Sequence, residues 1–223
     1  MKKLILITLA IFATTSLQAA VTVDTFNIGT SDLLYGGTSS NFTGISTSET
    51  IGGERYVEVF GPATIYATVD HPAADGQVTY NSGITDDGSM ILDYGRTTAL
   101  GVDLSVSGEN DRFRFDFVLL GEGFGAGNDT LKIDVEWDDA GTQTSSSTVN
   151  WPTSTGTFDI LFSSFGGSTP DWTAIDRITI TIDGRQASDV AIDSFGAVPE
   201  PATASMMALV ACLGFLIRRH FVA

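Results

Sequence analysis

The sequence predicts an all-β protein: a jelly-roll-like antiparallel β-sandwich with an apolar segment at each end of the chain. Between residues 21 and 197, hydrophobic residues alternate with polar ones in about a dozen short runs, which is typical of strands with one buried face. Glycine, asparagine, aspartate and serine separate these runs, as they do in turns. So many short strands in one domain are accommodated by a sandwich or a closed barrel.

The first 20 residues have the pattern of a secretory signal peptide. Lys2 and Lys3 form the charged start, residues 4–12 form an apolar core, and residues 16–20 offer small residues for cleavage by signal peptidase. The apolar core is too short to span a bilayer as a helix. We therefore expect export, with cleavage close to Ala20.

Three runs carry the clearest alternation. They are Arg112–Leu120, Leu131–Trp137 and Arg177–Ile182, and each places its large apolar residues on one face. Shorter runs of the same kind are Val21–Phe26, Arg55–Phe60, Thr64–Val69, Gln77–Tyr80, Met90–Tyr94, Gly101–Val106, Thr148–Trp151, Thr157–Phe162 and Val190–Phe195. The segment Thr38–Gly53 is rich in serine, threonine and glycine, and we expect a long surface loop there.

Composition excludes several classes of protein. The formal net charge is −16, so the chain lacks the basic surface that nucleic-acid binding requires, and we expect no nucleic-acid partner. The single cysteine, Cys212, lies in the C-terminal apolar run, which excludes a disulfide framework, thiol catalysis and a cysteine-ligated zinc site in the central domain.

Candidate catalytic residues are sparse. His71 is the only histidine of the central domain; it precedes a proline and is interpreted as a loop residue rather than as part of a Ser-His-Asp triad. Glu136, Asp138 and Asp139 are close in sequence, but the two aspartates lead into a glycine turn, where aspartate is common for conformational reasons. We therefore expect no enzymatic activity.

The C-terminal segment, residues 198–223, has three parts in a fixed order. Pro199, Glu200 and Pro201 disfavour regular structure, because each proline fixes φ and removes a main-chain donor. The apolar run 202–217 is predicted to be a single membrane helix, about 24 Å long at 1.5 Å per residue. Arg218 and Arg219 then stop transfer and are expected to stay on the cytoplasmic side.

This order resembles the PEP-CTERM sorting signal of exopolysaccharide-producing Gram-negative bacteria. The resemblance implies a partner, the membrane protease exosortase, which acts near Pro199, Glu200 and Pro201. It also implies a route: the protein is first anchored in the inner membrane and is then released to the cell surface or the extracellular matrix. The expected organisation is a signal peptide (1–20), a β-sandwich domain (21–197) and a sorting signal (198–223).

The second half of the domain resembles carbohydrate-binding-module-like jelly rolls. The resembling stretches are Gly101–Leu104, Asn110–Phe113, Thr157–Phe165, Trp172–Ile178 and Ala191–Asp193. Jelly rolls of this kind often hold a structural Ca²⁺ between their first and last strands. The resemblance therefore implies a calcium site with Asp24 and Asp193, joined by an acid such as Glu49. The aspartate-rich turns at 86–87 and 138–139 are the alternative location.

Sugar binding uses flat aromatic rings with polar groups beside them. Trp151, at a strand end before a proline, is the first candidate for an exposed ring, and Tyr35 and Tyr94 follow; Trp137 and Trp172 are expected in the core. The predicted function is non-catalytic binding of polysaccharide, or a contribution to an exopolysaccharide matrix. A structural matrix protein or adhesin without a small ligand is the alternative, and a glycan-active hydrolase is the third reading.

Overall fold

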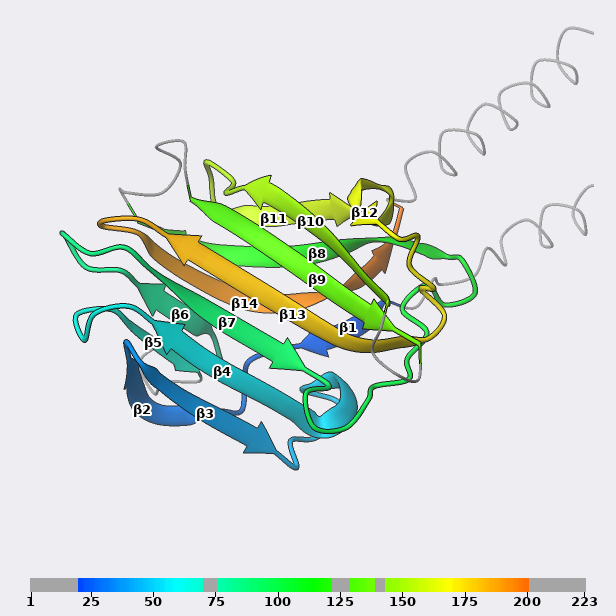
Figure 1. The fold of residues 1–223 in the computed structure, drawn as a ribbon, viewed down its shortest axis with the longest axis horizontal. Helices are drawn as coiled ribbons and strands as arrows, with labels where there is room; N and C mark the ends of the chain where they lie inside the picture. The colour runs from blue at the N-terminus through cyan, green and yellow to red at the C-terminus, as the bar shows by residue number, and fades with distance from the viewer. Residues whose placement is uncertain (1–19, 70–75, 122–128, 139–142, 201–223) are drawn as a thin grey trace, which may run out of the picture.

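The computed structural model describes residues 20–69, 76–121, 129–138 and 143–200. Within them, 14 strands form two seven-stranded antiparallel sheets that pack face to face (Figure 1). The predicted antiparallel β-sandwich is therefore confirmed. Among the described residues, no helix is long and apolar enough to cross a membrane.

Sheet A contains the first and the last of the described strands. Its spatial order is β11 (Gly156–Leu161), β8 (Asn110–Leu120), β14 (Asp189–Pro199), β6 (Val78–Asn81), β5 (Tyr66–Val69) and β2 (Thr30–Tyr35), and β1 (Val21–Asp24) pairs with the C-terminal half of β14. Strand β14 is thus central: β8 lies on one side along its length, and β6 and β1 share the other side.

Sheet B forms the second layer. Its spatial order is β12 (Gly166–Gly167), β10 (Gln143–Asn150), β9 (Thr130–Trp137), β13 (Ile175–Gly184), β7 (Gly88–Tyr94), β4 (Glu54–Phe60) and β3 (Thr38–Thr43). Two short 3-10 helices, η1 (Ile51–Gly53) and η2 (Phe162–Ser164), lie in the connections.

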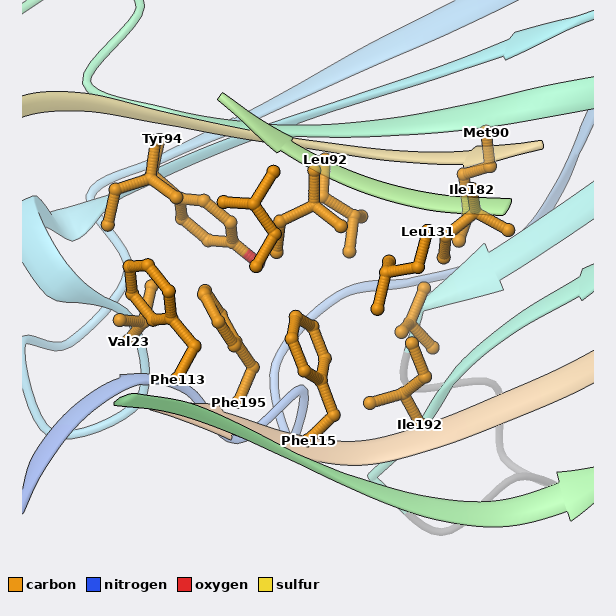
Figure 2. Close-up of a cluster of buried hydrophobic side chains, with 14 of the residues drawn as sticks. Val23, Met90, Leu92, Tyr94, Phe113, Phe115, Leu131, Ile182, Ile192 and Phe195 are labelled. Atoms are coloured by element: carbon orange, nitrogen blue, oxygen red, sulfur yellow. The ribbon is translucent and has the colours of Figure 1, made fainter. Parts of the chain in front are cut away.

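The core lies between the two inner faces. Phe113, Phe115 and Phe117 alternate along β8 and are at most 2% exposed, as their period-two spacing predicts. Figure 2 shows Phe113 and Phe115, with Phe195 of β14, pointing from sheet A toward sheet B. The Phe115 and Phe195 rings stack with centroids 4.5 Å apart, so β8 and β14 are joined by ring contacts as well as by main-chain pairing.

The predicted loop 38–53 is wrong in part, because it contains β3 and η1. Strand β3 has the sequence TSSNFT, which holds a single apolar residue and therefore shows no alternation. Its pairing with β4 at the edge of sheet B is what defines it. The predicted strand 101–106 is also wrong. Only Val102 makes a bridge, to Ile175, and the chain then turns through Val106 and Ser107, whose φ angles are +46° and +60°.

The end of the domain also differs from the prediction. Strand β14 continues past residue 197 through Val198 and Pro199, which pair with Arg112 and Asn110 of β8. A proline is tolerated there because the register of β14 against β8 shifts between Val198 and Pro199, and prolines in sheets occur at such irregularities. The predicted signal peptide up to residue 19, His71, and the tail with Pro201, the apolar run, Arg218 and Arg219 all lie outside the described residues.

Candidate functional site

Four polar-face residues from four neighbouring strands of sheet A lie in one cross-strand row. Tyr35 of β2 pairs with Tyr66 of β5, Tyr66 pairs with Asn81 of β6, and Asn81 pairs with Asp189 of β14. We call these four residues the tyrosine row. Four strands at 4.7–4.9 Å spacing make the row about 14 Å long.

The two rings lie side by side at the open edge of the sheet. Their centroids are 6.5 Å apart and the ring planes are inclined by 59°. Tyr35 is 43% exposed and Tyr66 is half-buried, whereas Ala67 and Val69 on the same strand point into the core. The pair therefore presents aromatic surface to solvent at one end of the row.

The position of Tyr35 is set by a glycine turn that links the two sheets. The Gly36 N–H donates to Ile65 O in the connection before β5, at 2.9 Å, and the Gly37 N–H donates to Val59 O of β4, at 2.8 Å. Gly37 has φ +78°, a conformation that favours glycine. The turn thus anchors the end of β2 to both layers of the sandwich.

The other end of the row is polar. The Asn81 Nδ2 donates to Asp189 Oδ1, and Asn81 Oδ1 accepts the Gly83 N–H at 2.9 Å, so the orientation of the amide is fixed. Burial raises the pKa of Asp189 above its ordinary value, and the hydrogen bond from Asn81 opposes this rise. Asp189 is also held through its main chain, because its carbonyl accepts the Gly121 N–H at 2.8 Å.

A second network holds the turns beside Asn81 and Asp189 together. Ser82 is fully buried; its hydroxyl donates to Arg185 O and accepts the Ser188 N–H at 2.7 Å. The Ser82 N–H donates to Ser188 O at 3.0 Å. The polar half of the row therefore stands on a fixed backbone and needs little ordering when a ligand binds.

The arrangement can bind a sugar through its rings and its polar groups. Two adjacent rings can pack against the apolar face of a sugar, and the amide and carboxylate can hydrogen-bond its hydroxyl groups. The row itself holds a single carboxylate, Asp189, whereas glycoside hydrolysis ordinarily needs two that flank the bond to be broken.

Two of the three aromatic residues proposed as ligand contacts are in the core, and these assignments were wrong. Trp151 is 4% exposed and packs edge-on against Phe117, with ring centroids 5.2 Å apart. Tyr94 is fully buried and its hydroxyl donates to Asp24 at 3.0 Å. Only Tyr35 is exposed.

The proposed calcium ligand Asp24 is a structural residue instead. Its carboxylate accepts hydrogen bonds from Arg55 Nη1, at 2.8 and 2.7 Å to its two oxygens, and from the Phe26 N–H at 2.8 Å. Both Asp24 and Arg55 are fully buried. The carboxylate is thus occupied by donors and is enclosed between the sheets, where Ca²⁺ would have to displace an arginine.

The two other proposed calcium ligands, Glu49 and Asp193, do not form a metal-binding group with Asp24. Glu49 accepts hydrogen bonds from Thr25 and Asn27, which lower its pKa, and Asp193 is exposed on β14. In the part of the chain that the structure describes, no group of three or more His, Cys, Asp or Glu side chains could hold a metal ion. Calcium binding stays a prediction without an assembled ligand set.

The outer face of sheet B carries paired charges, and Phe60, which is 42% exposed, lies at the end of β4 on the same face. Arg177 donates to both oxygens of Asp93, at 2.8 and 2.6 Å, and to Glu136 at 3.2 Å. The Arg96 guanidinium covers the Tyr56 ring, 3.8 Å from its centroid. These groups satisfy one another, as is usual on the solvated face of an antiparallel sheet.

Known proteins provide likeness of overall shape only. No protein-family model matches the sequence, and no curated protein matches it. The chain is similar to the family 11 carbohydrate-binding module of a cellulosomal cellulase of Clostridium thermocellum: identity is 15%, coverage is 82% of this chain and 96% of that one, and the TM-score is 0.41. A solution structure of a family 11 module gives 13% identity, coverage of 84% and 99%, and a TM-score of 0.43.

A family 61 module in complex with β-1,4-galactotriose is also similar, at 16% identity, with coverage of 65% of this chain and 88% of that one and a TM-score of 0.37. At TM-scores below 0.5 these likenesses carry no argument about the ligand. We therefore base the function on the tyrosine row alone.

Three members of the row were missed at the level of sequence. Tyr66, Asn81 and Asp189 each lie in or beside an alternating run, at a position expected to face away from the core. The alternation therefore indicated that these three side chains face solvent. It could not show that these residues are neighbours, because the register that aligns them joins strands far apart in the sequence.

Proposed function

We propose that the domain is a non-catalytic polysaccharide-binding module whose ligand lies along the tyrosine row. The single observation that carries this proposal is the placement of two adjacent tyrosine rings in register with a hydrogen-bonded Asn81 and Asp189. Ring surface followed by directional polar groups is the pattern by which proteins bind sugars. Because the backbone beneath the row is fixed before the ligand binds, little conformational entropy is lost on binding.

Affinity electrophoresis of the full-length protein through gels containing neutral polysaccharides tests this proposal. We expect retardation of the wild type, and at least tenfold weaker binding for Tyr66→Ala and for Tyr35→Ala. Tyr56→Ala is the matched control, because Tyr56 lies on the outer face of sheet B under Arg96. We expect this variant to bind polysaccharide as tightly as the wild type does. Retardation that survives both row substitutions would exclude this site.

If none of the polysaccharides retards the wild type, the alternative gains support: a structural matrix protein or adhesin without a glycan ligand.

We also propose that the protein is exported and sorted through its two terminal segments, with signal peptidase and an exosortase-type protease as partners. The support is the sequence order of the tail and the signal-peptide pattern. Replacing Glu200 and Pro201 with alanine, which leaves β14 intact, should keep full-length protein in the inner membrane of an exosortase-bearing host. Normal maturation of this variant would refute the sorting proposal.

We also propose calcium as a structural ligand, on the acidic composition and on the resemblance to jelly rolls that hold this ion. A specific site should raise the melting temperature more with Ca²⁺ than with Mg²⁺ at equal ionic strength, because Mg²⁺ sheds its water reluctantly. Equal effects of the two ions would mean that the acids contribute only surface charge.

A further inference from the structure

We infer that the tyrosine row selects uncharged, hydroxyl-rich polysaccharides and rejects acidic ones. This inference rests on the proposed function and concerns the chemical class of its ligand. Three observations carry it: the composition of the four strands, the donor and acceptor balance of the row, and the positions of the basic side chains.

The four strands of the row contain no lysine or arginine. Their sequences are TSDLLY, YATV, VTYN and DVAIDSFGAVP, which together contain three aspartates, one of them in the row itself. A uronate, sulfate or phosphate group on a ligand would thus approach Asp189 with no cation on these strands to compensate. Like charges within the Debye length, about 8 Å at physiological ionic strength, repel one another.

The polar end of the row presents a hydrogen-bond acceptor, the carboxylate of Asp189. Asn81 uses its Oδ1 for Gly83 and directs its Nδ2 to Asp189, so an ionised Asp189 is left as an acceptor. Sugar hydroxyl groups donate hydrogen bonds to such an acceptor, whereas an ionised carboxylate or sulfate of an acidic glycan has no proton to donate.

The basic side chains of the described residues have acidic neighbours of their own. Six of them are in ion pairs with carboxylates: Arg55, Arg96, Arg112, Arg114, Lys132 and Arg177. The seventh basic residue, Arg185, follows β13 and affects the titration of Asp183. Burial and the nearby Asp129 raise the pKa of Asp183, and the positive charge of Arg185 opposes this rise. The charge of Arg185 therefore acts on an acidic neighbour.

The surroundings of the row add negative charge. Asp86, in the turn after β6, accepts a hydrogen bond from Thr64, two residues before Tyr66. The formal net charge of the chain is −16, so the long-range field has the same sign. Anionic chains are thus disfavoured both at a distance and at the site.

The test compares each neutral polysaccharide with its own charged derivative. Mixed-linkage β-glucan, galactan and xylan are each used in three forms: unmodified, carboxymethylated, and hydroxyethylated to the same degree. The hydroxyethylated form is the control for the size of the added group, because it carries no charge. The full-length protein is measured by affinity electrophoresis in EDTA, which removes bridging Ca²⁺. We expect at least tenfold weaker binding to the carboxymethylated form than to the hydroxyethylated form, and a smaller ratio in 1 M salt, where the Debye length is about 3 Å.

Asp189→Asn should reduce this ratio several-fold. Asp134→Asn, which removes the same charge from the outer face of sheet B, should leave it unchanged. Equal or tighter binding of the carboxymethylated form would overturn the charge selectivity while the glycan-binding function stands. Failure of every polysaccharide, neutral or charged, to bind would instead overturn the proposed function and the selectivity with it.

Discussion

Arg55 of β4 and Asp24 of β1 form a fully buried ion pair that joins the two sheets: Arg55 Nη1 lies 2.7 Å from Asp24 Oδ2, and both side chains are 0% exposed. Tyr94 of β7 donates a further hydrogen bond to the same carboxylate. A charge pair in this position needs both partners, because either one alone would be a buried, uncompensated charge.

Removing one partner should therefore be costly. We expect Arg55→Ala and Asp24→Ala each to lower the free energy of unfolding by about 3–5 kcal/mol, and the double variant to lose much less than the sum of the two. Urea denaturation measures these losses. Arg96→Ala is the control: its pair with Glu58 is exposed and 3.8 Å long, so the loss should stay below about 1 kcal/mol. Additive losses in the double variant would contradict the coupling.

The alternation of buried and exposed residues along β8 leads to a second prediction. Phe115→Ala should cost about 3–5 kcal/mol, because Phe115 is fully buried against Phe195. Arg114→Ala, on the opposite face of the same strand, should cost under about 1 kcal/mol, because its pair with Asp159 is partly exposed. Chemical denaturation of both variants checks the difference, and equal losses would mean that the two faces are misassigned.

The Arg114–Asp159 pair predicts a pH dependence. Hydrogen bonds from Arg114, at 2.7 and 2.8 Å, hold the pKa of Asp159 below its ordinary value. The folded state thus binds this proton less tightly than the unfolded state does. The contribution of Asp159 to stability is present above the unfolded pKa of about 3.9 and is lost as the pH falls through the lower folded value.

Asp159→Asn should therefore flatten the loss of stability on acidification. The carboxylate is 26% exposed, so the effect should stay below about 1 kcal/mol. Urea denaturation of the wild type and the variant from pH 6 to pH 2 measures it. An unchanged difference between the two proteins across this range would show that Arg114 does not affect the titration.

The burial of Trp151 predicts that its substitution affects stability but not polysaccharide binding. Trp151→Phe should lower the melting temperature, because Trp151 is 4% exposed and packs against Phe117. Retardation in polysaccharide gels should stay the same, since the residue is not in the tyrosine row. A variant that melts normally but no longer binds would restore Trp151 as a ligand contact.

The end of β14 predicts where the chain can be shortened. A chain that stops after Glu200 keeps the pairing of Val198 and Pro199 with β8, whereas one that stops after Ala197 loses it. Each lost main-chain hydrogen bond should cost about 1 kcal/mol. Thermal unfolding of the two truncated proteins gives the comparison, and equal melting temperatures would show that these two residues do not contribute to the sheet.

The sequence by itself determined the fold class and the inner faces of the strands. Alternation is a local property, so Phe113, Phe115 and Phe117 could be assigned to the core without knowing what lies opposite them. The same property missed β3, whose sequence TSSNFT holds a single apolar residue, and misplaced the end of β14, where a proline follows a shift of register.

Only the tertiary structure decided which side chains meet. Asp24 and Arg55 are 31 residues apart and Asn81 and Asp189 are 108 apart, and nothing in the local sequence around either pair indicates its partner. The tyrosine row exists because four strands pair in one register, and a slip of one residue in any of them would turn its side chain to the opposite face. Register depends on the packing of the whole sandwich, which is why the site could not be read from the chain alone.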